Sequence, residues 1–224
     1  MFLHVKRKLM VVLKFSFSLF LDLRKFFDGL SEDEKLILSD LKGPSWYPEK
    51  KIKILLHSLA FGSLKPYLSK DSSSNVTQKN MEMTMDVMAN SIVYWTQGVV
   101  ERSLFSSNAR IYGMTSAGSR KIWPTYGPVS AAKSALESHI CQISVELAPR
   151  GITANSLCAG VTLTPALDKI PGNENIVDEA TKNNPSNRLT QTSDISGSII
   201  ALSHPGADWI TGNVIMVDGG EELT

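Results

Sequence analysis

The sequence has few of the residues that mark metal-binding, disulfide-bonded or nucleic-acid-binding proteins. It contains 2 cysteines, Cys141 and Cys158, and 4 histidines that lie far apart along the chain. Two isolated cysteines suit buried small side chains in a reducing compartment better than a disulfide framework. Neither residue type has the spacing of metal ligands, so we expect no metal site. The 23 basic and 22 acidic residues give a net charge of +1, so we also expect no nucleic-acid partner.

Long hydrophobic runs are also missing, apart from residues 9–21. Basic residues precede this run, as in a signal peptide, but Lys14 interrupts it and no small-residue cleavage site follows. A stretch of 13 residues is too short to span a bilayer. Short apolar runs are common in the cores of parallel sheets. We therefore expect a buried strand here, no stable membrane insertion and a cytoplasmic protein.

From about residue 50 the chain alternates between strand-like and helix-like segments. The strands are expected at residues 52–56, 111–114, 152–158 and 210–217, and the helices at 81–104, 130–147, 173–184 and 194–202. Such alternation is typical of a parallel sheet with crossover helices. The pattern predicts an α/β fold with a doubly wound, Rossmann-like sheet in three layers, α/β/α. A chain of 224 residues suits a single domain.

Tyr126 and Lys133 lie seven positions apart near the start of the helix expected at 130–147. Seven residues make nearly two turns, so two helical residues at this spacing share one face. A phenol has a pKa of about 10, and a nearby ammonium group favours its ionised form. The tyrosine can then give a proton to an enolate or alkoxide, while the lysine holds a cofactor ribose. On spacing alone, a packed aromatic and a surface lysine are the commoner outcome.

The ends of the expected strands strengthen the functional interpretation. Ser116 follows the strand at 111–114, and ligands bind at the carboxyl ends of strands in open α/β sheets. Taken alone, such hydroxyl residues also serve as turns or helix caps. Small or hydroxylated residues follow two further strands and would meet the same edge: His57, Ser58, Ala60, Gly160, Thr162 and Thr164. The sequence therefore predicts a ligand site at this edge.

Several segments together resemble the short-chain dehydrogenase/reductase family. They are residues 115–119 (TSAGS), 126–137 (YGPVSAAKSALE), 145–155 (VELAPRGITAN) and 210–220 (ITGNVIMVDGG). The six residues between Tyr126 and Lys133, where most members have three, resemble the enoyl-acyl carrier protein reductases. The pair His57-Ser58 and the pair Ala159-Gly160 resemble the same branch. The likeness covers roughly residues 50–222.

The resemblance implies a role for each matching residue. Tyr126 would stabilise an enolate oxygen, Lys133 would bind the nicotinamide ribose, and Ser116 stands where some enoyl reductases have a second tyrosine. The other residues expected to bind the cofactor, NADPH or NADH, are His57, Ser58, Ala60, Gly160, Thr162 and Thr164. The asparagine that many members carry in the long helix falls on Met88, so Asn90 is given no catalytic role.

The N-terminal part departs from the family pattern. Members hold the cofactor pyrophosphate on a glycine-rich turn after the first strand, whereas this chain has only Gly29 and Gly43 before His57. Losing two charge-assisted hydrogen bonds of about 1.5–3 kcal/mol each would weaken binding by roughly two to four orders of magnitude. We expect residues 1–50 to hold at most a remnant of the first unit, in which Asp22-Leu23 would correspond to the end of the family's third strand. Residues 51–224 would form the catalytic and C-terminal part of an N-terminally incomplete domain.

Three functions stay open. The first is NAD(P)H-dependent reduction of the carbon-carbon double bond in an enoyl thioester carried by acyl carrier protein or CoA, as in fatty-acid synthesis. The second is a carbonyl or hydroxyl oxidoreductase of the same family, and the third is a truncated, non-catalytic homologue. The helices at 81–104 and 130–147 carry more apolar residues than one buried face needs, and the family usually forms tetramers through them. A homotetramer is therefore the expected assembly.

Overall fold

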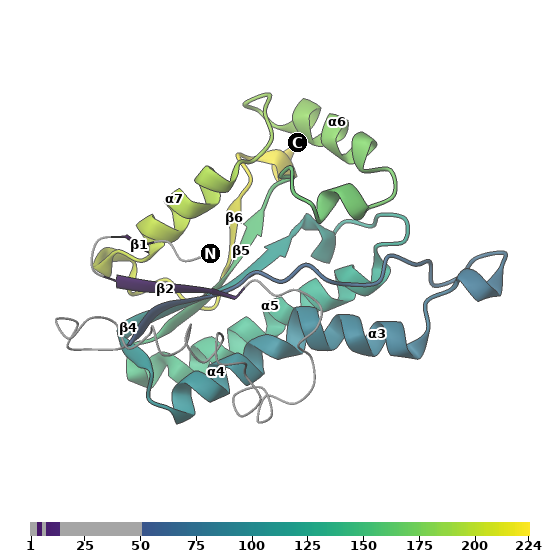
Figure 1. Cartoon of the computed structure of the whole chain (residues 1–224). Coiled ribbons are helices and arrows are strands. Elements are labelled where there is room, and N and C mark those ends of the chain that lie inside the picture. The colour runs from purple at the N-terminus through teal and green to yellow at the C-terminus, as the bar shows by residue number, and fades with distance from the viewer. Residues whose placement is uncertain (1–3, 6–7, 14–50) are drawn as a thin grey trace.

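A parallel sheet forms the centre of the protein in a computed structural model, which describes residues 4–5, 8–13 and 51–224 (Figure 1). The strands lie side by side in chain order: β1 (His4–Val5), β2 (Lys8–Leu13), β3 (Ile52–His57), β4 (Phe105–Ser116), β5 (Thr153–Ala159) and β6 (Val214–Val217). Strand β1 is antiparallel to β2, and all the other neighbours are parallel. Their carboxyl ends therefore meet at one edge of the sheet.

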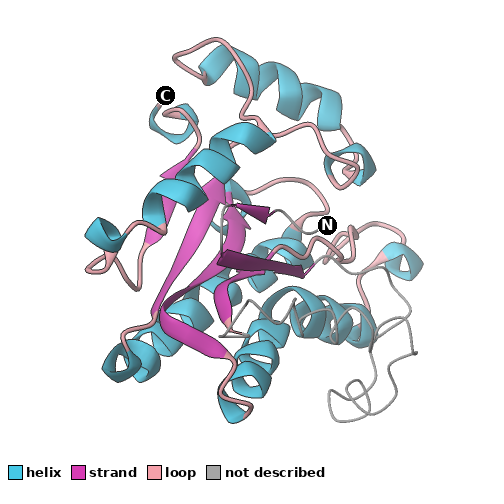
Figure 2. Cartoon of the chain, turned by 60° about the vertical axis from the view of Figure 1, so that its left-hand side comes forward, coloured by secondary structure: helices cyan, strands magenta, loops and turns pink. Residues whose placement is uncertain are grey.

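Helices cover both faces of this sheet, as Figures 1 and 2 show. On one face lie α3 (Gln78–Met85), α4 (Ser91–Glu101) and α5 (Gly127–Leu147), and on the other lies α7 (Thr192–Leu202). A further helix, α6 (Asn173–Asn183), stands beyond the carboxyl ends of the strands. The arrangement confirms the predicted three-layer, doubly wound fold.

Helix α5 packs closely against β4. Its apolar stripe of Leu136, Ile140, Ile143 and Leu147 is buried, as its spacing predicts. A β-carbon at Gly113 would lie 3.2 Å from Ile140 and 3.3 Å from Leu136. A glycine in β4 thus lets the helix that carries Tyr126 and Lys133 approach the sheet.

The central strands bury both of their faces. Leu55 and Ile111 join the core beneath α3, α4 and α5, while Leu56 and Tyr112 pack with Ile199 of α7. The side chains of neighbouring residues in a strand point to opposite faces of the sheet. A strand covered on both faces therefore appears in the sequence as a continuous apolar run. This explains why these strands show no alternation of polar and apolar residues.

Several element boundaries differ from those predicted. The helix expected at 81–104 begins at Gln78, is interrupted by a π-helical turn at Asp86–Asn90 and ends at Glu101. The last strand is shorter than expected and starts at Val214, because Gly212 adopts a left-handed conformation with φ of 73° just before it. The strand expected at 111–114 is instead 12 residues long, Phe105–Ser116.

The N-terminal predictions are tested in part. The described portion of the apolar run forms β2, the expected strand, which pairs in parallel with β3. Residues 14–21 and Asp22-Leu23 lie outside the described residues. None of the helices in the described residues is long and apolar enough to cross a membrane.

Candidate active site

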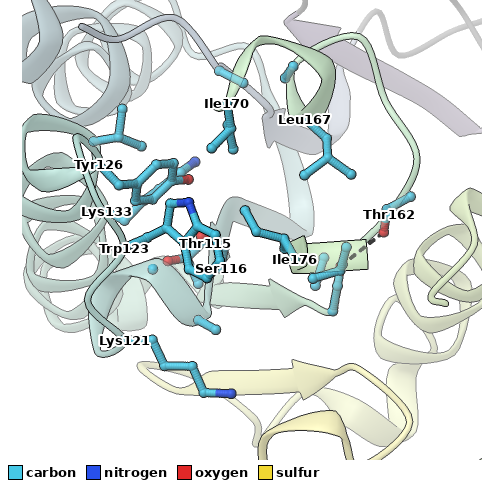
Figure 3. A pocket seen from close by; sticks show the side chains of 18 of the residues that line it. Thr115, Ser116, Lys121, Trp123, Tyr126, Lys133, Thr162, Leu167, Ile170 and Ile176 are labelled. Atoms are coloured by element: carbon cyan, nitrogen blue, oxygen red, sulfur yellow. Dashed lines mark hydrogen bonds between the residues drawn. The ribbon is translucent and has the colours of Figure 1, made fainter. Parts of the chain in front are cut away.

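A cavity of about 450 Å³ lies at the carboxyl ends of β3, β4 and β5 (Figure 3). Residues that follow each of these strands line it, together with the start of α5 and part of α6. Much of the lining is apolar, including Phe61, Met88, Trp123, Leu167, Ile170 and Ile176. Polar groups from Ser116, Tyr126, Lys133 and Thr162 also face it. Such an apolar cavity with a few converging polar groups is the usual form of a small-molecule site.

Tyr126 occupies the N-cap position of α5, and its side chain makes no capping hydrogen bond. The preceding turn fits tightly around it, because a β-carbon at Gly118 would collide with its ring. Burial raises the pKa of the phenol, and the neighbouring Ser116 hydroxyl partly opposes that rise. Even so, Ser116 Oγ makes no hydrogen bond of normal geometry to any described residue. Tyr126 is therefore a protonated phenol at neutral pH, beside the buried hydroxyl of Ser116.

Lys133 extends from α5 into the same cavity, with 6% of the residue exposed. Its ammonium group donates hydrogen bonds to the carbonyl oxygen of Met114 at 2.7 Å and to that of Leu59 at 3.5 Å. Burial lowers its pKa to about 8, against the opposing effects of Glu137 and then Cys158. An ammonium group has three N–H donors, and the described residues accept two of them. A charged donor is thus left for a ligand.

The loop after β5 forms the opposite wall, where Figure 3 shows Thr162 across the cavity from Tyr126 and Lys133. Thr162 donates a 3.0 Å hydrogen bond to the carbonyl oxygen of Gly160, and Thr164 accepts one of 3.3 Å from the amide of Leu167. The amide of Val161 donates to the carboxylate of Glu221 at 3.1 Å. The structure thus brings Gly160, Thr162 and Thr164 into one cavity with Ser116, Tyr126 and Lys133.

The residues after β3 are brought to the cavity only in part. Ala60 lines it, whereas His57 and Ser58 do not. The imidazole of His57 is fully buried, with Nε2 2.8 Å from Ser91 Oγ. Burial lowers its pKa to about 3, and the positive charge of Lys133 adds to this effect. The His57 side chain is therefore a neutral core group, and the expectation that it faces a cofactor does not match its position.

The long helix presents Met88 to the cavity, and Asn90 lies elsewhere. Asn90 Oδ1 is 3.1 Å from His139 Nε2 on α5. The structure thus leaves the sulfur-containing side chain of Met88 at the place where the resemblance would expect an asparagine.

Sequence reasoning missed Lys121, Trp123, Glu221 and Glu222 in the cavity wall. Trp123 Nε1 donates a 3.3 Å hydrogen bond to the carbonyl oxygen of Pro171, which ties the loop before Tyr126 to the loop before α6. Lys121 forms a 2.7 Å ion pair with Glu222, and Glu221 holds Val161. An aromatic residue three positions before Tyr126 was the available signal for Trp123. No local pattern pointed to Glu221 or Glu222, because their contacts join distant segments.

The cavity fits the nicotinamide end of a dinucleotide. The N–H of Lys133 that the described residues leave unpaired points to a ligand with a hydroxyl acceptor such as a ribose. A β-carbon at Gly160 would clash with Thr190 and Glu221, so a glycine there lets the loop after β5 pack against these two residues. Ala60 and Thr162 complete the wall. Among residues 51–224 there is no turn with the glycine spacing that binds a pyrophosphate.

Comparison with known proteins finds similar reductases. A family model described as enoyl-(acyl carrier protein) reductase matches residues 46–222. The NADH-dependent enoyl-acyl carrier protein reductase FabI of Buchnera aphidicola is 28% identical over 169 residues, covering 75% of this chain and 64% of that protein. The crystal structure of the Aquifex aeolicus enoyl-acyl carrier protein reductase (NADH) is similar with a TM-score of 0.72 and 26% identity, over 87% of this chain and 73% of that one.

A gluconate 5-dehydrogenase from Gluconobacter oxydans is also similar, with 24% identity over 64% of this chain and 56% of that enzyme. The chain spans 64% and 63% of the length of the Buchnera and Aquifex enoyl reductases in the sequence comparison.

Proposed function

The chain belongs to the enoyl-acyl carrier protein reductase family, within the short-chain dehydrogenases/reductases, and we propose that it reduces the carbon-carbon double bond of an enoyl thioester. The substrate would be carried by acyl carrier protein or CoA, and NADH or NADPH would donate the hydride. The observation that carries this proposal is the joint placement of a protonated Tyr126 and a charged Lys133 in one apolar cavity.

In this proposal Lys133, Thr162 and Thr164 would hold a nicotinamide, which would supply a hydride to the carbon β to the thioester carbonyl. Negative charge would then develop on the carbonyl oxygen, and the phenol of Tyr126 would donate a hydrogen bond to that oxygen. Such a donor stabilises an enolate strongly because the apolar walls exclude water. The raised pKa of Tyr126 keeps the phenol proton in place until the charge forms. A proton from water would then reach the α-carbon and give the saturated thioester.

Lys133 holds the cofactor and sets the local charge. Its free N–H would bind a ribose hydroxyl, while its bonds to Met114 and Leu59 fix the ammonium group in the cavity that Tyr126 also lines. Gly160, Thr162 and Thr164 would face the nicotinamide and Ala60 the adenosine half. Because the described residues hold no glycine-rich turn, we expect weaker binding of the dinucleotide than in relatives that have one.

Ketone reduction is a second candidate, because the hydroxyl of Ser116 lies beside the phenol of Tyr126 and both residues line the cavity. A hydroxyl in this position can bind a ketone oxygen together with the phenol. Turnover of a crotonyl thioester and of a small ketone, with each cofactor, separates the two. Enoyl reduction without ketone reduction is the expected result, and ketone reduction alone would select the second activity.

The non-catalytic alternative makes a different prediction. A chain that keeps the fold without the activity would bind neither dinucleotide, so titration calorimetry with NADH and NADPH tests it directly. Heat from binding of either one, reduced by Lys133→Met, is expected if the site is functional.

We also propose a single-domain subunit that assembles as a homotetramer through α4 and α5. Exposed apolar side chains on these helices support this, with Tyr94 37% and Val145 71% exposed. Sedimentation equilibrium measures the mass of the assembly, and Val145→Glu should lower it.

A further inference from the structure

One face of α5 makes hydrogen bonds to the carboxyl end of β4 and to the residues just after that strand. Lys133 donates to the carbonyl oxygen of Met114 at 2.7 Å, and Ser134 donates to that of Ser119 at 3.2 Å. One turn further along the helix, Glu137 accepts a 2.6 Å hydrogen bond from the hydroxyl of Thr115. These three contacts surround Ser116, so they fix the strand end against the start of the helix.

Glu137 makes the contact of this set in which a carboxylate takes part. Its side chain is 17% exposed, and Arg120 Nη1 lies 3.9 Å from its carboxylate. Arg120 in turn reaches Cys158 Sγ at 3.4 Å and Met216 Sδ at 3.6 Å. The carboxylate is thereby joined to β4 through Thr115, and to β5 and β6 through Arg120. It does not line the cavity itself.

The same carboxylate belongs to the electrostatic surroundings of Lys133. The groups that act on this ammonium are Glu137 on α5, Cys158 on β5 and the neutral imidazole of His57 on β3. Tyr126, at the N-cap of α5, lines the same cavity. Burial lowers the pKa of Lys133 to about 8, and Glu137 is the largest effect that opposes it. A carboxylate favours the charged form of a nearby amine.

We propose that Glu137 is a positioning residue, which fixes the Thr115–Ser116 strand end through its hydrogen bond and keeps the Lys133 ammonium charged at neutral pH. The proposal rests on the proposed reductase function for its kinetic consequences. The effect of Glu137 on the pKa of Lys133 does not require bound cofactor or substrate. It can therefore be measured in the free protein.

Glu137→Gln is the primary test, because the amide oxygen can still accept from Thr115 while the negative charge is lost. The matched control is Glu146→Gln, an exposed glutamate on the same helix that accepts from Gln142. The alkaline limb of the kcat/KM profile should move down by about one pH unit in Glu137→Gln and stay in place in the control. A uniform loss of activity with no movement of the limb would overturn the proposal.

A second readout needs no turnover. The pKa of Lys133 can be followed in the free protein by carbon-proton NMR of the lysine side chains, assigned with Lys133→Met. The titration midpoint should be lower in Glu137→Gln than in the wild type, and unchanged in Glu146→Gln. An unchanged midpoint in Glu137→Gln would refute the proposal, whereas absent turnover with a shifted midpoint would refute only the reductase function.

The hydrogen bond is tested separately at Thr115, which also covers the case in which Glu137→Gln does not fold. Thr115→Val removes the donor but leaves the charge of Glu137. We expect it to lower kcat about tenfold without moving the alkaline limb, and Thr115→Ser to restore kcat. Wild-type kcat in Thr115→Val would show that the bond positions nothing.

Discussion

The ammonium nitrogen of Lys133 lies 2.7 Å from the carbonyl oxygen of Met114, near the carboxyl end of β4, where Ser116 lines the cavity. This bond holds a positive charge in a site that water barely reaches, since 6% of the residue is exposed. The positive charge can bind an anionic or hydroxyl group of a ligand at neutral pH. Its burial also lowers the free energy of unfolding, since burial disfavours the charged form. Both consequences can be measured.

The cost of burying Lys133 predicts a dependence of stability on pH. Its pKa in the folded protein is about 8, below the ordinary value of 10.5, so the unfolded chain binds more protons between these values. Stability should therefore rise with pH across this window relative to Lys133→Met, by as much as about 3 kcal/mol. Urea unfolding of both proteins at pH 7.5 and 10 measures the difference. Parallel curves would contradict a buried, charged lysine.

His57 predicts a loss of stability in acid. Its pKa is lowered from 6.5 to about 3 by burial and by Lys133, so the folded protein resists the proton that the unfolded chain accepts. The stabilising contribution is complete above pH 6.5 and is lost as the pH falls towards 3. We expect the wild type to lose about 2 kcal/mol more than His57→Gln between pH 7 and pH 5. Equal losses in denaturant titrations would place His57 in contact with solvent.

Thr125 predicts a gain in stability by substitution. It has a φ of 64°, which is unfavourable for a β-branched residue, and its hydroxyl is buried without a partner among the described residues. Asparagine tolerates this conformation, so Thr125→Asn should stabilise the protein by about 1 kcal/mol. Thr125→Val keeps the branched shape and is the control, which should show no gain from relief of strain. The thermal unfolding midpoint of each variant decides between them.

The bond between Trp123 and Pro171 predicts a closed cavity wall. Trp123→Phe keeps an aromatic ring but removes the Nε1 donor, so the loop before α6 loses its tie to the loop before Tyr126. Faster hydrogen-deuterium exchange is expected in residues 167–183, with a higher KM for a long-chain enoyl thioester. Trp209, which is 98% exposed, supplies the control variant Trp209→Phe. Similar exchange in both variants would show that the bond does not close the wall.

The sequence predicted the features that depend on local pattern and on sheet topology. The buried stripe of α5 follows from its 3.6-residue period, and the meeting of Ser116, Gly160 and Thr162 follows from the parallel order of the strands. The family resemblance supplied the pairing of Tyr126 with Lys133, which spacing alone would not have singled out.

Other features depend on contacts between distant segments and left no local signal. The π-helical turn at Asp86–Asn90 places Met88 in the cavity and Asn90 against His139. Glu221 reaches Val161 across 60 positions, and His57 turns into the core to meet Ser91. Secondary-structure propensity depends on neighbours in the sequence. It therefore cannot predict the position of a side chain whose contacts are with residues far away in the sequence.

Hydride transfer to an enoyl thioester is the central claim, and isotope labelling tests it most directly. The protein is incubated with a crotonyl thioester and NADH or NADPH that carries deuterium at the transferable position, and the product is analysed by mass spectrometry. We predict a saturated thioester with one deuterium on the β-carbon, formed at least tenfold more slowly by Tyr126→Phe. An unreduced thioester with both cofactors, or equal rates for the wild type and Tyr126→Phe, would contradict the account.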